Sequence, residues 1–94
     1  MIEILKRIKV ETGLTGDNSY DQVILNHIDT VRQMCEDAGI KDEDMDFDPY
    51  FIQLCLIYSK TFIGYKQDGS VRELPSSFDK ILFQYKSSFI GRQK

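Results

Sequence analysis

The segment from Pro49 to Tyr65 places the tightest constraint on the fold, because its apolar side chains lie on nearly every side of a helix. Those side chains belong to Phe51, Ile52, Leu54, Cys55, Leu56, Ile57, Tyr58, Phe62 and Ile63. Gln53 and Lys60, seven residues apart, mark its narrow polar edge. A helix that is apolar nearly all round has to be covered by other elements. We therefore predict that this helix, at about 49–65, lies in the centre of a bundle or inside an interface.

Glycine and proline residues divide the rest of the 94-residue chain into three further helix candidates. These run over about 2–12, 19–38 and 77–88, and a short tail at 89–94 follows the last one. The helix at 19–38 has the clearest pattern, because its apolar residues recur in steps of three and four. We predict a single all-α domain, a small four-helix bundle-like fold with a central apolar helix and polar loops.

Two helix starts carry capping signals. Ser19 and Gln22 have the spacing of a capping box at the start of the 19–38 helix. Asp17 or Asn18 offers an alternative cap for the same helix, so its start is open by two residues. Asp48 precedes a proline, the arrangement in which aspartate caps a helix whose first residue needs no free N–H.

The apolar stripes of three helices predict the core. We expect it to contain Ile24, Ile28, Val31, Cys35, Ile52, Cys55, Leu56, Phe62, Phe78, Ile81, Leu82 and Tyr85. The two cysteines are read as buried thiols in a reducing compartment, with a disulfide between the two helices as the alternative. Aromatic residues make up 12% of the chain, more than a small core needs, so some are expected at interfaces. The candidates are Tyr50, Tyr65, Phe83 and Phe89.

Charge is divided unevenly along the chain. The net charge is −3, which argues against a general nucleic-acid binder with a basic surface. Residues 16–48 hold ten acidic and two basic side chains, whereas residues 49–94 hold seven basic and three acidic ones. The split is either incidental or the mark of a bipolar subunit. Opposite charges on two faces favour head-to-tail contacts between copies, or docking onto a charged partner.

The loop before the central helix is the most acidic part of the chain. Its carboxylates belong to Asp42, Glu43, Asp44, Asp46 and Asp48. The last three, in alternate positions, imitate the start of a calcium-binding loop. However, Pro49 stands where that loop needs glycine, and Cys55 stands where it needs a glutamate. We therefore expect a solvated loop whose charges favour the start of the next helix, and no metal.

No motif in the chain predicts catalysis, a cofactor or a membrane anchor. His27, the only histidine, lies on an apolar stripe, where packing is the expected role rather than metal binding. Phosphate-binding loops, a nucleophile elbow and a zinc-protease motif are all missing. The longest apolar run, Leu54 to Tyr58, is far shorter than the roughly 20 residues of a membrane helix. The first residues do not read as a secretory signal, so a cytoplasmic origin is expected.

The order of these segments resembles that of a known family. A short helix containing Ile4-Leu5-Lys6-Arg7-Ile8-Lys9 precedes a polar break, and Asp17 to Asp21 open the long second helix. A glycine break then leads to the proline-led apolar helix. The stretch from Leu74 to Lys86 has the pattern Leu-Pro-x-x-Phe-x-x-x-Leu-x-x-Tyr-Lys, the most specific part. Residues 2–89 together resemble the small head–tail connector (adaptor) proteins of tailed bacteriophages, also labelled DNA-packaging proteins.

The resemblance implies a structural virion protein without enzymatic activity. Its subunits would form a ring below the portal, dodecameric to match it, assembled in the bacterial cytoplasm and placed at the head–tail junction. The ring would extend the channel for double-stranded DNA, retain the packaged DNA and carry stopper or tail-completion proteins. The family's C-terminal segment docks on the portal, which here corresponds to Ser87 through Lys94. Its candidate docking residues are Phe89, Ile90, Arg92 and Lys94.

The resemblance also gives the acidic residues a role. An acidic wall repels phosphate and lets DNA slide, whereas a basic wall holds it. We therefore expect part of the loop from Asp42 to Asp48, or the acids of the 19–38 helix, to face the channel or the next subunit. Three alternatives remain: a helical partner-binding or regulatory module that forms no ring, a helix-turn-helix DNA binder, and a small enzyme. The acidic half of the chain argues against the second, and no motif supports the third.

Overall fold

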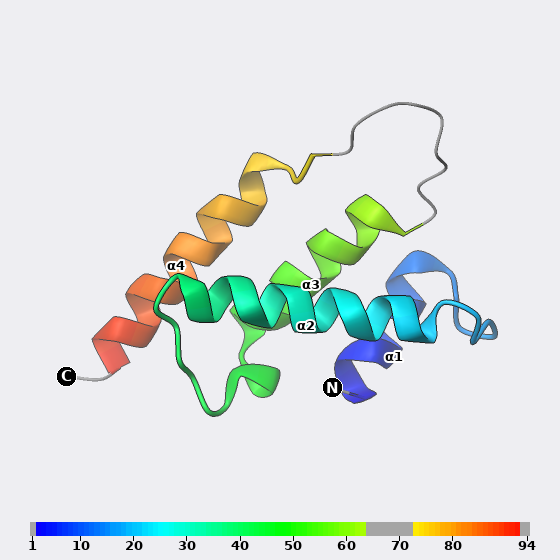
Figure 1. The fold of residues 1–94 in the computed structure, drawn as a ribbon, viewed down its shortest axis with the longest axis horizontal. Coiled ribbons are helices and arrows are strands. Elements are labelled where there is room, and N and C mark those ends of the chain that lie inside the picture. Colours follow the sequence, from blue (N-terminus) through cyan, green and yellow to red (C-terminus); the bar gives the residue numbers. More distant parts are fainter. Residues whose placement is uncertain (1, 64–72, 93–94) are drawn as a thin grey trace.

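Four α-helices build the chain in the computed structural model, which describes residues 2–63 and 73–92 (Figure 1). The described residues contain no strand, so the predicted all-α, four-helix class is confirmed. The loop before the third helix also contains a short 3-10 helix. The elements are α1 (Ile2–Thr12), α2 (Asp21–Asp37), η1 (Met45–Phe47), α3 (Pro49–Phe62) and α4 (Ser76–Arg92).

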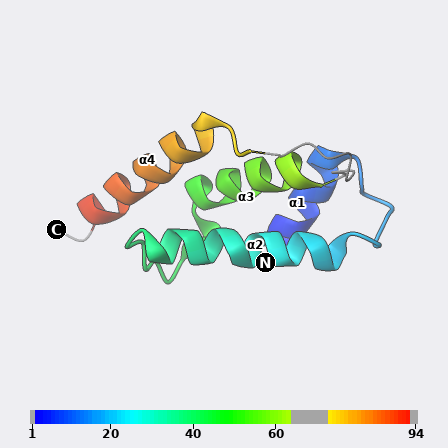
Figure 2. The same cartoon turned by 45° about the horizontal axis from the view of Figure 1, so that its top comes forward.

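The apolar helix α3 is central, as its sequence predicts. It packs against α1, α2, α4 and η1. Helix α4, in contrast, packs mainly against α3. In Figure 1, α2 crosses α3, and Figures 1 and 2 show α1 and α4 on opposite sides of α3. The molecule measures 45 × 29 × 17 Å, so it is flat. The flatness leaves α4 with one covered face and one open face.

The two predicted caps have different outcomes. Asp48 caps α3 as predicted: its Oδ1 accepts a hydrogen bond of 2.9 Å from the backbone N–H of Tyr50. The capping box at Ser19 is wrong, because the N-cap of α2 is Tyr20 and makes no side-chain cap bond. The Ser19 hydroxyl and N–H instead donate to Asp17 Oδ1, at 2.5 and 2.9 Å. This local turn competes with the helix for the serine and moves the start of α2 to Asp21.

Both ends of α1 and the start of α3 lie where the sequence predicts them, whereas the other helix ends differ by one to four residues. α2 covers 21–37 rather than 19–38, and Gly39, at φ +95°, takes the left-handed conformation that closes it. α3 is assigned through Phe62, and the predicted residues 64–65 lie outside the described residues. α4 begins one residue earlier than predicted and continues to Arg92, so most of the predicted tail at 89–94 is helix.

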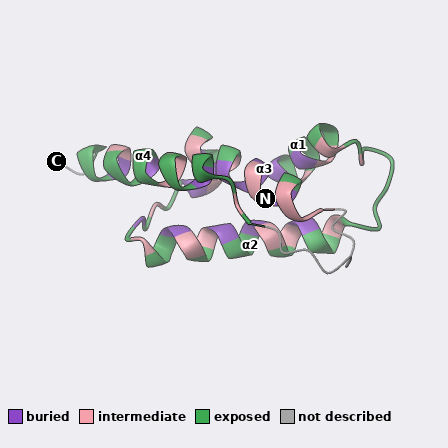
Figure 3. Cartoon of the chain, turned by 90° about the horizontal axis from the view of Figure 1, so that it is seen from above, coloured by how far each residue is buried: buried purple, intermediate pink, exposed green. Residues whose placement is uncertain are grey.

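The core is larger than predicted and includes an apolar side chain of the acidic loop, Met45. Eight predicted residues are fully or almost fully buried: Ile24, Ile28, Val31, Cys35, Cys55, Leu56, Phe78 and Tyr85. Four others, Ile52, Phe62, Ile81 and Leu82, are only half-buried, which corrects their assignment to the core. Ile81 and Leu82 are only half-buried because one face of α4 is open to solvent. The core also takes in Ile4, Ile8, Ile40, Met45, Phe51, Leu54 and Phe89 (Figure 3).

Both cysteines are free, buried thiols, so the disulfide alternative is wrong. Burial raises the pKa of Cys35 to about 12 and raises the pKa of Cys55 further. A thiol with such a pKa is protonated at neutral pH and is a poor nucleophile. These residues therefore act as small apolar side chains between α2 and α3.

Candidate interaction surfaces

The acidic loop is not the open patch that its sequence predicts, because three of its carboxylates are engaged within the chain. Asp42 Oδ2 accepts a hydrogen bond of 2.9 Å from the hydroxyl of Tyr85. Asp46 forms an ion pair with Arg32 of α2. Asp48, besides capping α3, lies 3.0 Å from Arg92 Nη2. Of the five predicted residues, only Glu43 and Asp44 are exposed to solvent.

Arg92 ties the end of α4 to this loop. Its Nη1 lies 3.9 Å from Asp42 Oδ2, in addition to the contact with Asp48. Its guanidinium lies over the rings of Tyr85 and Phe89, each centroid at 6.0 Å. We call Arg92, Asp42, Asp48 and Tyr85 the α4 clasp. The clasp explains why the last helix continues beyond its predicted end.

The clasp corrects part of the predicted docking segment. Phe89 is 8% exposed and belongs to the core, because α4 extends far enough to press its ring inward. Arg92 is half-exposed but already paired within the chain. Ile90, by contrast, is 47% exposed and stays available for docking. Lys94 lies outside the described residues, as does Tyr65.

The titration of these groups fits structural roles. Burial raises the pKa of Tyr85, and the hydrogen bond to Asp42 raises it further, so the phenol remains a donor. Burial also acts to raise the pKa of Asp46, but the hydrogen bond and charge of Arg32 outweigh it and lower that pKa. Arg32 further lies over the ring of Phe51, 5.1 Å from its centroid. The Tyr85–Asp42 hydrogen bond holds the loop to α4, and the Arg32–Asp46 ion pair holds it to α2.

Exposed acids also lie on α2, next to the acidic loop. Asp29, Glu36 and Asp37 lie on the solvent side of this helix. Glu36 and Glu43, with Lys41 and Asp42, line one shallow depression between the end of α2 and the loop. We call Asp29, Glu36, Asp37, Glu43 and Asp44 the acidic face. It is the part of the predicted acidic patch that can meet another molecule.

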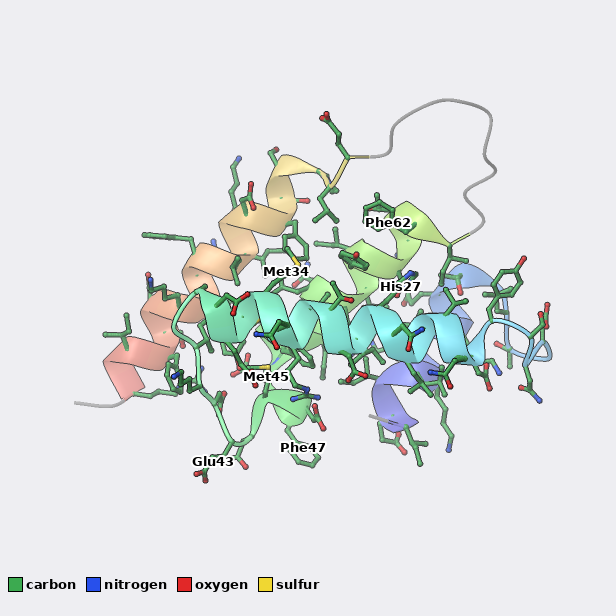
Figure 4. The ribbon with its side chains drawn as sticks, in the orientation of Figure 1. His27, Met34, Glu43, Met45, Phe47 and Phe62 are labelled. Atoms are coloured by element: carbon green, nitrogen blue, oxygen red, sulfur yellow. The ribbon has the colours of Figure 1, made fainter. Side chains whose placement is uncertain are left out.

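A groove lies between α1 and η1. It has a volume of about 530 Å³ and is mostly apolar. Phe47 stands at its edge with 81% of its surface exposed, and Val10 is 65% exposed. Figure 4 shows Phe47 and Glu43 both projecting from this side of the molecule. Phe47 is not among the interface residues predicted from the sequence, although a phenylalanine between two aspartates and off any helical stripe is a usable signal.

The open face of α4 carries the second apolar surface. Phe83 is 71% exposed, and Ile90, seven residues later, lies on the same side of the helix. We call Phe83, with Asp79, Lys80 and Lys86, the α4 stripe; Ile90 lies beyond it, at the end of the helix. Helix α4 lies across α3 from α1, as Figure 1 shows. Of the predicted interface aromatics, Phe83 is therefore exposed, whereas Tyr50 is half-buried and stacks on Tyr85 at 6.0 Å.

His27 has the predicted packing role. Its Nδ1 lies 3.2 Å from the hydroxyl of the buried Ser59, and its ring meets that of Tyr58 edge-on at 5.1 Å. The ring of Phe62 lies 6.4 Å away, and burial lowers the pKa of the imidazole.

Within residues 2–63 and 73–92, no three His, Cys, Asp or Glu side chains cluster as a metal would require. None of the described helices is long and apolar enough to cross a bilayer.

Comparisons of the chain with protein-family models, with curated proteins and with solved structures found no match. The case for a function therefore depends on the residues and surfaces described above.

Proposed function

We propose that this chain is a structural subunit of a phage head–tail connector. In this role, copies form a ring below the portal, extend the DNA channel, retain the packaged DNA and support stopper or tail-completion proteins. The observation that carries the proposal is the presence of two exposed apolar surfaces on opposite sides of α3, the α1–η1 groove and the α4 stripe.

Surfaces on opposite sides of a subunit favour a particular kind of assembly. A patch that binds its own copy produces a closed dimer, whereas two different patches produce head-to-tail contacts. Head-to-tail contacts close into a ring when the rotation between subunits allows it. The pattern shared with connector proteins, above all from Leu74 to Lys86, gives this ring its place in the virion.

The acidic face is assigned to the channel in this proposal. Its carboxylates on α2, Asp29, Glu36 and Asp37, would repel the phosphates of double-stranded DNA, which would pass without sequence-specific contacts. The end of α4, with Ile90 exposed beside Arg92, is assigned to the portal. The clasp supports this assignment because it keeps the end of α4 in a fixed position.

Native mass spectrometry over a concentration series, at low and moderate salt, tests the proposal. We expect a closed ring, a dodecamer if it matches the portal, whose population falls as salt rises. Charge then contributes to the contact between subunits. A chain that stays monomeric throughout, and forms only a one-to-one complex with another protein, contradicts the ring.

That second outcome would support a small helical partner-binding module. The open α1–η1 groove favours this alternative, because a groove of about 530 Å³ with an exposed phenylalanine at its edge can receive an apolar side chain of another protein.

A further inference from the structure

We propose that the α4 stripe of one copy docks into the α1–η1 groove of the next copy, with Phe83 as the anchor. The inference rests on the proposed ring and specifies the contact that builds it. The two surfaces belong to one chain but lie on opposite sides of α3. A contact between them is therefore head-to-tail.

The stripe has the make-up of an interface anchor. Phe83 is the most exposed large apolar side chain of α4. Asp79 and Lys80 lie one turn before it, and Lys86 lies one turn after it. In the described part of the chain, these three charged side chains have no ion-pair partner. An exposed aromatic ring flanked by unpaired charges is typical of a contact that buries the ring and leaves the charges at its rim.

The groove offers matching features. Val10 and Phe47 give it an apolar lining, and the α1 side carries Lys6 and Arg7 together with Glu3. Glu43 and Asp44 lie outside the groove, in the loop that precedes η1. Lys6, Arg7, Glu43 and Asp44 have no ion-pair partner among the described residues. The α1 side of the groove thus has a net positive charge, and the loop next to the groove has a negative one.

Charges of the two surfaces are complementary. Asp79 on the stripe can meet Lys6 or Arg7 of the neighbouring copy. Lys80 and Lys86 can meet Glu43 and Asp44 of that copy. With Phe83 between them, the charges set the orientation of the helix in the groove, while the ring supplies the affinity.

A substitution at the anchor tests the contact. Phe83→Ser removes the ring from a solvent-exposed position, so the monomer is expected to keep its fold, as circular dichroism can verify. We expect the dissociation constant between copies to rise by about thirtyfold or more, the typical effect of losing an interface hot spot. Val23→Ser is the matched control, because Val23 is exposed on α2 outside both surfaces and should leave assembly unchanged.

Charge reversal tests the pairing. Lys86→Glu alone and Glu43→Lys alone should each weaken assembly, and the two substitutions in one chain should restore it. Failure of the double variant to recover overturns the proposed alignment. Glu73→Lys with Lys86→Glu is the control, because it restores the same net charge with a residue outside both surfaces and should not restore assembly.

Disulfide capture tests the direction of the contact. Val10→Cys and Ser87→Cys proteins, mixed and oxidised, should form a crosslink between the two variants, because Ser87 is exposed one turn after Phe83 and its replacement keeps the anchor ring. The native cysteines are buried and should not compete. A crosslink formed only between two Ser87→Cys chains would show a symmetric contact and overturn the inference.

These outcomes separate the inference from the proposed function. A wild-type chain that assembles while Phe83→Ser assembles equally well overturns the groove contact and leaves the ring intact. A wild-type chain that remains monomeric at every concentration and salt, and forms only a one-to-one complex with another protein, overturns both.

Discussion

At the residue scale, the α4 clasp holds the acidic loop against the end of α4. Tyr85 is buried, yet its hydroxyl finds Asp42 at 2.9 Å. Arg92 reaches the same carboxylate and also Asp48. Loop carboxylates that look free in the sequence therefore hold α4 and the start of α3 together.

Removing the tyrosine hydroxyl should weaken the clasp. Tyr85→Phe keeps the ring but removes the phenol hydrogen bond to Asp42 Oδ2, and a hydrogen bond to a charged group contributes about 1.5–3 kcal/mol. We expect the free energy of unfolding to fall by about that amount, measured by urea denaturation. Ser87→Ala, at an exposed site on α4, should change it by less than about 0.5 kcal/mol. Equal midpoints for the two variants would contradict a stabilising clasp.

His27 should make stability depend on pH. Because burial lowers its pKa in the folded state, the unfolded chain binds a proton more readily, at a pKa near 6.5. The free energy of unfolding should therefore fall as pH decreases from about 7 through about 6.5 toward 5.5. His27→Gln keeps a polar partner for Ser59 but cannot titrate, so its unfolding free energy should vary less over that range. An identical pH dependence in the two proteins would exclude His27 as the cause.

At the element scale, the end of α4 shows how packing extends a helix. Its last turns contain Gly91 and carry few apolar residues, so the sequence pattern predicts an early end. Phe89 nevertheless packs into the core and Arg92 pairs with the loop. Tertiary contacts outweigh weak local helix propensity here. Such contacts are the usual source of helix stability in proteins.

Neighbouring substitutions in this turn should have very different effects. Phe89→Ala should lower the free energy of unfolding by about 3 kcal/mol, because it leaves a cavity in the core. Ile90→Ala, at the next residue but 47% exposed, should change it by about 0.5 kcal/mol or less. Chemical denaturation of the pair measures both. Similar losses in both would mean that the segment is not a packed part of the domain.

At the scale of the whole molecule, charge and shape act together. The molecule is flat, with α1, α2 and α4 packed around α3, and this arrangement exposes the α4 stripe and the α1–η1 groove on opposite sides. The acidic face occupies α2 and the tip of the loop. In a ring, every charge of that face is repeated in each subunit, so its effect on DNA is multiplied.

Reversing one charge of the acidic face should change how a ring treats DNA. Glu36→Lys should give the assembled protein measurable affinity for double-stranded DNA at low salt, seen as a gel shift that disappears as salt rises. Glu73→Lys makes the same change of net charge outside the acidic face and should bind less DNA. Equal binding by the two variants would mean that net charge alone matters and that the acidic face does not line the channel.

The sequence by itself determined the helical class, the central position of α3, its aspartate cap and most of the core. These follow from local signals: the spacing of apolar residues, the distribution of polar side chains around one helix, and an aspartate before a proline. Tertiary structure alone decided which acids are free, how far α4 continues and where Phe47 lies. These depend on groups far apart in the chain, such as Arg92 and Asp48, whose pairing no local pattern contains.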